Sequence, residues 1–282
     1  LPLAADVTVL DELPTEPLPV AREGASLIES VRSRGRLRVG FVPNQAPFSH
    51  VNARGALVGF DVEMAHALAR ELAAPLELAP VARDQLVEVL EAGRVDLVMA
   101  GILVTTRRAA RVTFSAPYLD ETLAFLVPDH RRAEFSSAAR VRAIEGVRLG
   151  VPDLPYLEQL VAREFPNATV VPMPLNDPEA PLAGRVNSVA AIVLTAVRGS
   201  FLTLLHPSFS VAVPRPLEIE LPLAYPVARH DVEAARFLST WIDLKKKDGT
   251  IQALYDHWIL GKDAKAKEPR WSVLRDVLGW GR

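Results

Sequence analysis

The chain has 282 residues, of which 49% are hydrophobic and 23% are charged, and its formal net charge is -2. This length and apolar content are sufficient for two cores, and therefore for about two domains. The charge balance, together with the lack of a basic tract interleaved with aromatic residues, excludes nucleic acid as the expected partner. The longest apolar run, residues 189–197, ends at Arg198 and is shorter than the ~18 residues that span a bilayer.

The chain contains no cysteine, which excludes disulfides and thiolate zinc sites. Its six histidines are scattered and form no ligand pair of the kind that holds a metal. The sequence starts at Leu1 without a basic region followed by an apolar one. We therefore expect a mature or trimmed product whose targeting segment is missing.

The first half of the chain alternates patterns typical of strands and helices. Residues 1–20 carry four prolines and predict an extended linker. The segments that follow are a helix at 26–34, a strand at 37–41, a loop at 43–48, a helix at 61–72 that Asp61 caps, a strand at 76–79, a helix at 86–93, a strand at 97–100 and a strand at 121–127.

The second half repeats this alternation after a polar crossing at 129–145. We predict strands at 148–151, 169–171 and 190–194, extended runs at 209–213 and 221–228, and helices at 156–164, 197–205, 231–247 and 250–260. Residues 172–181 are a proline-rich loop, and the tail is polar until the apolar-rich segment 271–280.

Two β/α blocks joined by two extended passages indicate an α/β protein with two lobes. Each lobe is expected to be a mainly parallel sheet flanked by helices, with hinge crossovers near Val127 and near residues 213–221. A ligand of such a protein lies between the lobes, at the carboxyl ends of the strands. The predicted divisions are a linker at 1–25, lobe 1 at 26–127 and 222–260, lobe 2 at 128–221, and a C-terminal tail at 261–282.

The stretch from Asp96 to Tyr118 has the features of a carboxylate site. A buried strand leads to Gly101, where the chain leaves the sheet, and Thr105 can cap a short helix at 106–111. The N-terminus of a helix beside a sheet attracts anions, and Arg108 adds a guanidinium fork within one turn of it. The same residues are also compatible with a solvated helix start.

Several motifs then occur in a characteristic order. They are Leu37-Arg-Val-Gly40, Ala46-Pro-Phe48, Gly59-Phe-Asp-Val-Glu-Met-Ala65, Leu90-Glu-Ala-Gly-Arg-Val-Asp96, the run from Gly101 to Arg108, Phe114-Ser-Ala-Pro-Tyr118, and Lys247-Asp-Gly-Thr250 with Trp258. Together they resemble the bacterial extracellular solute-binding proteins of the polar amino acid type (family 3), which have the type II periplasmic-binding fold. The similarity runs from about residue 26 to about residue 260 and is densest in the first lobe.

This resemblance implies a binding module that closes on a small ligand, with neither cofactor nor catalytic nor metal residues. Arg108 stands where the family grips the ligand carboxylate, and Gln45 and Arg83 stand where stacking aromatic residues are usual. The ligand-binding residues predicted in this way are Arg108, Leu103, Gly101, Gln45, Arg83, Phe48, Tyr156 and Thr195.

The acid that pairs with a ligand ammonium in amino acid binders has no visible counterpart here. The phrase Gly184-Arg-Val-Asn-Ser188 supplies none, whereas Arg83, Arg108 and Arg198 could all face the cleft. Because a desolvated ammonium without an acceptor is costly, we expect a small organic acid, such as a dicarboxylate or an acidic amino acid. Basic and large apolar amino acids are disfavoured.

The resemblance further implies delivery of the ligand to a membrane transporter at the periplasmic or extracellular face of the bacterial inner membrane, by a domain that is monomeric when soluble. The transporter is an ABC permease or a fused cation symporter. Residues 194–199, 204–207 and 241–244 resemble binding domains joined to dicarboxylate/amino acid:cation symporters. The alternatives are a sensor input domain and a dehydratase acting on cyclohexadienyl acids or arogenate, for which Glu121 and Asp153 are the acids nearest the cleft.

Overall fold

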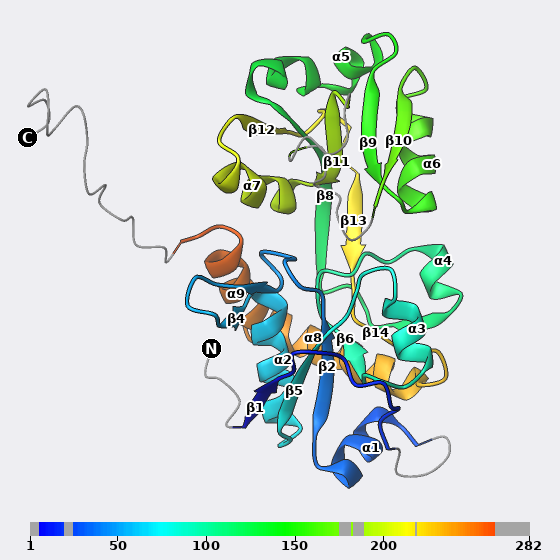
Figure 1. Cartoon of the computed structure of the whole chain (residues 1–282), viewed down its shortest axis with the longest axis vertical. Coiled ribbons are helices and arrows are strands. Elements are labelled where there is room, and N and C mark those ends of the chain that lie inside the picture. The colour runs from blue at the N-terminus through cyan, green and yellow to red at the C-terminus, as the bar shows by residue number, and fades with distance from the viewer. Residues whose placement is uncertain (1–5, 20–24, 175–181, 183–188, 218, 263–282) are drawn as a thin grey trace, which may run out of the picture.

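The computed structural model describes residues 6–19, 25–174, 182, 189–217 and 219–262 and shows two lobes joined by two strands (Figure 1). Lobe 1 holds a six-stranded sheet in the order β1-β5-β2-β6-β14-β7. Its strands are β1 (Val7–Val9), β2 (Leu37–Phe41), β5 (Leu76–Pro80), β6 (Leu97–Val98), β7 (Val112–Phe114) and β14 (Pro226–Ala228). The pairings among β1, β5, β2 and β6 are parallel, and β14 is antiparallel to its neighbours.

The helices of lobe 1 form where apolar residues recur at helical spacing and local caps end the run. Ser26 and Glu29 make a capping box at the first helix, which stops at Gly35 in the left-handed conformation. The helices are α1 (Leu27–Arg34), α2 (Phe60–Glu71), α3 (Leu86–Glu91), α4 (Thr106–Ala109), α8 (Val232–Lys247) and α9 (Thr250–Trp258), with a small hairpin of β3 (His50–Val51) and β4 (Leu57–Val58).

Lobe 2 holds a second sheet in the order β10-β9-β11-β8-β12. Its strands are β8 (Leu119–Pro128), β9 (Arg148–Pro152), β10 (Thr169–Met173), β11 (Ala191–Thr195) and β12 (Phe209–Ala212). Its helices are α5 (Ala138–Arg142), α6 (Pro155–Glu164), α7 (Ala196–Leu205) and a 3-10 turn at Asp129–Phe135. Strands β9, β10 and β11 are parallel to one another, and β8 pairs antiparallel with both β11 and β12, so this sheet is mixed.

The two lobes are connected by β8 and β13 (Glu220–Leu223), which pair antiparallel from Leu119 with Leu223 to Thr122 with Glu220. From Leu123 onward β8 belongs to the sheet of lobe 2. The predicted crossover near Val127 is therefore wrong, because Val127 pairs with Ser210 inside that sheet. The crossings lie at residues 119–122 and 220–223, and the first segment of lobe 1 ends near residue 118 rather than 127 (Figure 1).

The predicted linker at 1–25 is wrong for the part that the structure describes. Val7–Val9 adds an edge strand to the lobe 1 sheet, and the Leu10 N–H donates to the Leu78 carbonyl. Leu18 is buried, and its N–H donates to the carbonyl of Gly93. The leucines spaced between the prolines pack on lobe 1. A prediction based on proline content alone does not detect this packing. Residues 1–5, 20–24 and 263–282, which include the predicted apolar tail segment, lie outside the described residues, as does the phrase at 184–188.

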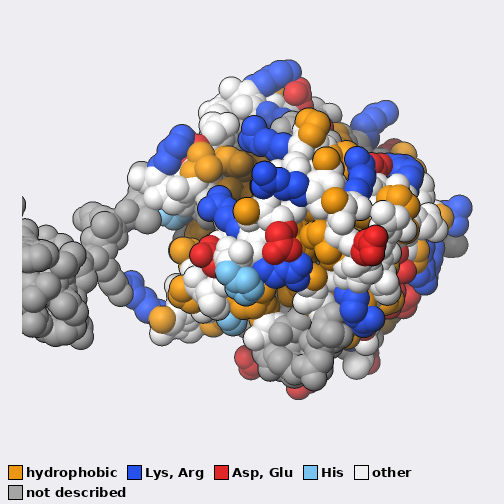
Figure 2. All heavy atoms as spheres, turned by 90° about the horizontal axis from the view of Figure 1, so that it is seen from above, with side chains coloured by type: hydrophobic (Ala, Val, Ile, Leu, Met, Phe, Trp, Pro, Cys, Tyr) orange, Lys and Arg blue, Asp and Glu red, His pale blue; other side chains and the backbone are white. Residues whose placement is uncertain are grey.

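The remaining predicted helices and strands are confirmed to within a few residues, and the extended run at 221–228 splits into β13 and β14 around Ala224 and Tyr225. None of the helices in the described ranges has the length and apolar content to cross a membrane. Figure 2, which looks onto the lobe 2 end, shows arginine and lysine side chains spread among hydrophobic and acidic ones. Lobe 2 contains ion pairs such as Arg131 with Glu134 at 2.7 Å.

Candidate ligand-binding site between the lobes

A cavity lies between the lobes, beside β8 and β13, the two strands that connect them and that we call the hinge strands. Six of the eight predicted site residues line it, namely Gln45, Phe48, Arg83, Gly101, Leu103 and Thr195. The rest of the wall comes from the hinge strands and from lobe 2, through Glu121, Leu221, Leu223, Pro152, Leu154, Leu157, Ile192, Val193, Leu194, Arg198 and Leu202. The cavity is thus a composite of both lobes, as the sequence analysis predicted.

Gly101 forms part of the lobe 1 wall and must be glycine. Its φ is 61°, in the left-handed region, and a Cβ there would lie 2.6 Å from a ring carbon of Phe48. The Gly101 N–H donates to a carboxylate oxygen of Asp61 at 2.6 Å. Asp61 therefore does not cap α2 as predicted; Gly59 occupies the cap position, and Asp61 instead fixes the turn that carries Gly101. Burial raises the pKa of Asp61 to about 6.

Arg108 does not line this cavity. It sits in α4, where its backbone N–H is capped by Thr105, and its side chain is only 6% exposed. Its Nη1 donates to the carbonyl of Leu103 at 2.9 Å, so the guanidinium supports the wall of the cavity from behind. Arg108 and Tyr156 line a neighbouring cleft between α3, α4 and the start of α6, which shares Arg83 and Leu154 with the cavity.

The cationic groups of the cavity are Arg83 from lobe 1 and Arg198 from lobe 2. Burial lowers the pKa of Arg83 to about 9, helped by the charges of Arg108 and Arg198 and opposed by that of Glu121. Arg198 lies in the first turn of α7, and its Nη1 donates across the lobes to the carbonyl of Ala46 at 2.8 Å. The conformation is therefore a closed one, with lobe 2 in contact with the loop after β2.

Glu121 places a carboxylate in the cavity wall, on the hinge strand β8. It is 4% exposed and hydrogen bonds to Thr195. Burial is the main reason that the pKa of Glu121 rises to about 7. Glu121, one of the two acids that the sequence places nearest the cleft, therefore lines it. Asp153, the other acid considered, lines the neighbouring cleft instead.

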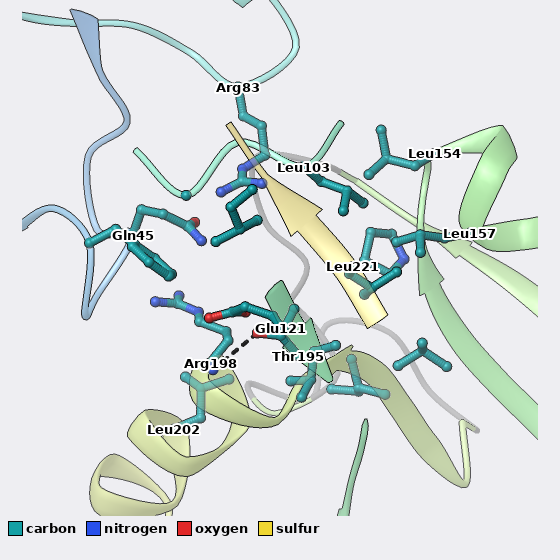
Figure 3. A pocket seen from close by; sticks show the side chains of 17 residues that line it. Gln45, Arg83, Leu103, Glu121, Leu154, Leu157, Thr195, Arg198, Leu202 and Leu221 are labelled. Carbon is teal, nitrogen blue, oxygen red and sulfur yellow. Dashed lines mark hydrogen bonds between the residues drawn. The ribbon is translucent and has the colours of Figure 1, made fainter. Parts of the chain in front are cut away.

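The cavity is divided into a polar and an apolar side. Figure 3 shows the side chains of Gln45, Arg83, Glu121 and Arg198 gathered on one side, with a hydrogen bond from the Arg198 backbone N–H to the hydroxyl of Thr195 at 3.2 Å. The other side is made by leucines, among them Leu154, Leu157 and Leu221. Such a cavity can hold a small molecule with a charged end and an apolar body.

Comparison with known proteins agrees with this geometry. The family profile of bacterial extracellular solute-binding proteins, family 3, matches residues 37–261. The L-cystine-binding protein TcyJ of Escherichia coli (strain K12) is 27% identical over 242 residues, which cover 82% of this chain and 85% of that protein. A cyclohexadienyl dehydratase of Pseudomonas aeruginosa is 25% identical over 235 residues, which cover 83% of this chain and 86% of the enzyme.

Solved structures show the same fold. The crystal structure of the ancestral amino acid-binding protein AncCDT-1, a precursor of cyclohexadienyl dehydratase, superposes with a TM-score of 0.69 at 27% identity. The match covers 83% of this chain and 100% of that one. With a profile match over both lobes and a shared two-lobed architecture, the chain belongs to the bacterial extracellular solute-binding proteins, family 3.

Proposed function

We propose that the chain captures a small molecule that has one carboxylate and an apolar body, and delivers it to a membrane transporter. The observation that carries the proposal is the meeting of Arg83 and Arg198, from opposite lobes, at the polar side of one largely apolar cavity. A carboxylate held by both guanidiniums would interact with both lobes at once. Its binding energy would therefore favour the closed conformation over an open one.

The charges of the cavity favour an anion. Burial is the main reason that the pKa of Arg83 is lowered, and the charges of Arg108 and then Arg198 lower it further. A carboxylate between Arg83 and Arg198 would offset their mutual repulsion. Guanidinium groups also match a carboxylate in shape, through paired N–H donors.

The apolar side argues against a second charge on the ligand. A second carboxylate would have to lose its water against Leu154, Leu157 and Leu221, whose side chains carry no donor to replace it. We therefore favour a monocarboxylate with an apolar body over the dicarboxylate or acidic amino acid that the sequence predicted.

The direct test is a thermal-shift and calorimetric screen of the twenty L-amino acids with mono- and dicarboxylic acids of four to six carbons. Ligands that bind only the folded state raise the melting temperature. We expect a monocarboxylate or amino acid with an apolar body to bind most tightly. Tighter binding of arginine, lysine or succinate would contradict the proposal. Arg83→Gln and Arg198→Gln should weaken binding, whereas Arg132→Gln, at an exposed position of lobe 2, is the matched control.

Delivery to a transporter rests on family membership, which also supports a place at the periplasmic or extracellular face of the inner membrane. The transporter is either an ABC permease or a cation symporter. Uptake of radiolabelled ligand by membrane vesicles that contain the transporter should depend on addition of this chain. Uptake that is the same without it would remove the transport role and leave sensing.

A second candidate function is elimination from a cyclohexadienyl acid, as in the dehydratase relative. The observation that favours it is Glu121, whose pKa of about 7 in the cavity suits a general acid. Incubation with prephenate and with arogenate, followed by the absorbance of the aromatic product, tests this activity. Binding without product formation leaves capture and delivery as the function.

A further inference from the structure

Glu121 lies on the hinge, where closure of the lobes changes its exposure to water. It pairs with Leu221 across β8 and β13, and its side chain lines the cavity. In the closed form it is only 4% exposed, and part of its cover comes from Thr195 of lobe 2. Parting of the lobes withdraws Thr195 and admits water to the carboxylate. Because water favours the ionised form of an acid, the protonation state of Glu121 can follow the conformation.

The hydrogen bonds of Glu121 in the closed form suit a neutral acid better than a carboxylate. Thr195 hydrogen bonds to its carboxyl group. The oxygen Oε1 is buried and has no hydrogen-bond partner among the residues that the structure describes. A buried ionised oxygen without a donor is costly, whereas in a neutral acid the same oxygen can carry the proton and become a donor itself.

The charged and titratable groups around Glu121 come from several elements. Arg83, just before α3, and Asp61 of α2 act on it with opposite signs, and the hydroxyl of Tyr118 is held by Asp61. Arg198 of α7 extends into the same polar side of the cavity (Figure 3). Burial outweighs the attraction of Arg83 and raises the pKa of Glu121 to about 7. Glu121 therefore titrates near neutral pH before a ligand enters.

A ligand carboxylate between Arg83 and Arg198 would bring a second negative group to this side of the cavity. Two carboxylates that share a site do not both ionise readily, so one of them retains a proton. The ligand carboxylate has guanidinium donors from both lobes, whereas Oε1 of Glu121 has no donor among the described residues. The proton therefore belongs on Glu121.

We propose that ligand capture is coupled to the uptake of one proton, which Glu121 holds as a neutral acid and donates in a hydrogen bond from Oε1 to the ligand carboxylate. This inference rests on the proposed function and adds the regulation of the same site. One proton passes from the solvent to Glu121, the ligand remains an anion, and the proton returns to the solvent when the lobes open. Binding is then tighter at pH 6 than at pH 8, where the ionised Glu121 must first be neutralised.

The experiment measures the proton directly, with 4-methylpentanoate as the probe. This monocarboxylate has an apolar body, and its own carboxyl group stays ionised between pH 6 and pH 8. Calorimetry in buffers of different ionisation enthalpy gives the number of protons taken up on binding. For the wild type we expect close to one proton at pH 8, about 0.1 proton at pH 6, and a Kd that rises about tenfold between the two. This range lies below the pKa of Arg83, about 9, so its charge is kept.

Glu121→Gln is the test variant, because its amide takes up no proton and can place an N–H donor where the neutral acid has its O–H. It should bind without proton uptake, and its Kd should change less than about twofold between pH 6 and pH 8. At pH 8 it should therefore bind about tenfold more tightly than the wild type. Glu220→Gln is the matched control, since Glu220 is an exposed glutamate on the other hinge strand, and it should keep the proton uptake of the wild type. Asp61 is unaltered in all three proteins.

The outcomes separate this inference from the proposed function. Binding to the wild type without proton uptake at pH 8 overturns the inference and leaves carboxylate capture standing. Uptake that persists in Glu121→Gln assigns the proton to another group, and weaker binding of this variant at pH 8 shows that the charge of Glu121 is needed; either result also overturns the inference. If 4-methylpentanoate binds at neither pH and the other monocarboxylates also fail to bind, the proposed function fails and the inference fails with it. If Glu121→Gln does not fold, the proton count of the wild type decides.

Discussion

Tyr118 and Tyr225 stack with their ring centroids 4.4 Å apart, and each hydroxyl donates a 2.8 Å hydrogen bond to a different oxygen of Asp61. Tyr118 immediately precedes β8, and Tyr225 is the second residue after β13. Both strands that cross between the lobes are therefore anchored at one carboxylate of lobe 1. The same carboxylate holds the N–H of Gly101, so the hinge and the cavity wall share a fixed point.

Removing one of these hydroxyls should destabilise the protein. Tyr225→Phe leaves an oxygen of the buried Asp61 without its donor, which costs about 1–3 kcal/mol. Urea denaturation of the ligand-free protein measures the change. Tyr156→Phe, at a side chain that is 38% exposed, is the control and should stay within about 0.5 kcal/mol of the wild type. Equal stability of the two variants would show that the Asp61 network contributes little.

Gly101→Ala should be far more harmful than the same change at another left-handed glycine. Alanine at a φ near +60° costs roughly 1–2 kcal/mol. Gly146 has a φ of 62° and open space around its Cβ position, so Gly146→Ala isolates that cost. Gly101→Ala adds an overlap with the ring of Phe48 and should lose about 3 kcal/mol in urea denaturation. It should also weaken ligand binding. Similar losses in both variants would mean that Phe48 moves aside freely.

The stability of the ligand-free protein should fall as the pH rises from about 4.5 to about 7. The pKa of Glu121 is raised from 4.5 to about 7 in the folded chain, so between these values the folded state binds more protons than the unfolded state. The unfolding free energy then decreases with rising pH, by about 3 kcal/mol for a shift of this size. Asp61, whose pKa is raised to about 6, adds a loss in the same direction at slightly lower pH.

Comparison of the wild type with Glu121→Gln isolates the contribution of Glu121 to the pH dependence. His66, whose pKa is lowered by burial, changes stability in the opposite direction, but its contribution is the same in both proteins and cancels from their difference. The groups whose charges act on the Glu121 carboxylate are Arg83 and Asp61, and Thr195 bonds to it; none of them is altered in the variant. In urea denaturation at pH 5, 6, 7 and 8, the unfolding free energy of the variant should increase relative to that of the wild type as the pH rises. A constant difference across this range would contradict the raised pKa.

Arg83 and Arg108 should contribute unequally to ligand affinity. Arg83 lines the cavity, so Arg83→Gln removes a buried charge-assisted contact and should cost roughly 2–5 kcal/mol in calorimetry. Arg108 supports the carbonyl of Leu103, and Arg108→Gln should cost about 1 kcal/mol. The reverse order would place the ligand in the neighbouring cleft that Arg108 and Tyr156 line.

Ligand binding should close the lobes about β8 and β13. In the closed form Arg198 donates to the carbonyl of Ala46, and His50 contacts Phe201 with ring centroids 5.9 Å apart. These contacts alone are few, so we expect the ligand-free protein to be more open. Small-angle scattering should give a smaller radius of gyration with saturating ligand than without. Identical curves would indicate a permanently closed cleft.

The fold was largely predictable because each element carried its own signal. The alternation of short apolar runs with helical periodicity identified both lobes. The first helix lies between Ser26, whose side chain caps it, and Gly35, which adopts the left-handed conformation because it has no Cβ. The packing of the N-terminal segment was not predicted, because its proline content indicates a linker and its contacts are with residues far along the chain. Leu10 and Leu18 donate backbone hydrogen bonds to the carbonyls of Leu78 and Gly93. The hinge was misplaced because β8 is one continuous strand, and nothing local marks the residue at which it leaves one lobe.

The sequence predicted the cavity residues whose position follows from the backbone. It did not predict the direction in which a side chain points. Gly101 and Leu103 lie in the wall because the turn after β6 puts them there. Arg108 is next to that turn but points to the Leu103 carbonyl, which sequence spacing cannot distinguish from pointing into the cavity. Glu121 was identified from the sequence as an acid near the cleft, because it is a charged residue at the start of a strand that becomes apolar toward Val127.

The location of Glu121 on a hinge strand has a kinetic consequence. A residue near the axis of a rotation is displaced little, so Glu121 presents the same carboxylate whether the lobes are apart or together. Arg198, by contrast, is carried on lobe 2 and reaches the lobe 1 side only on closing. Association should therefore occur in two stages, a rapid encounter at the hinge and a slower unimolecular step. In stopped-flow fluorescence the observed rate should level off at high ligand concentration, and its plateau should drop in Arg198→Gln but not in Glu121→Gln.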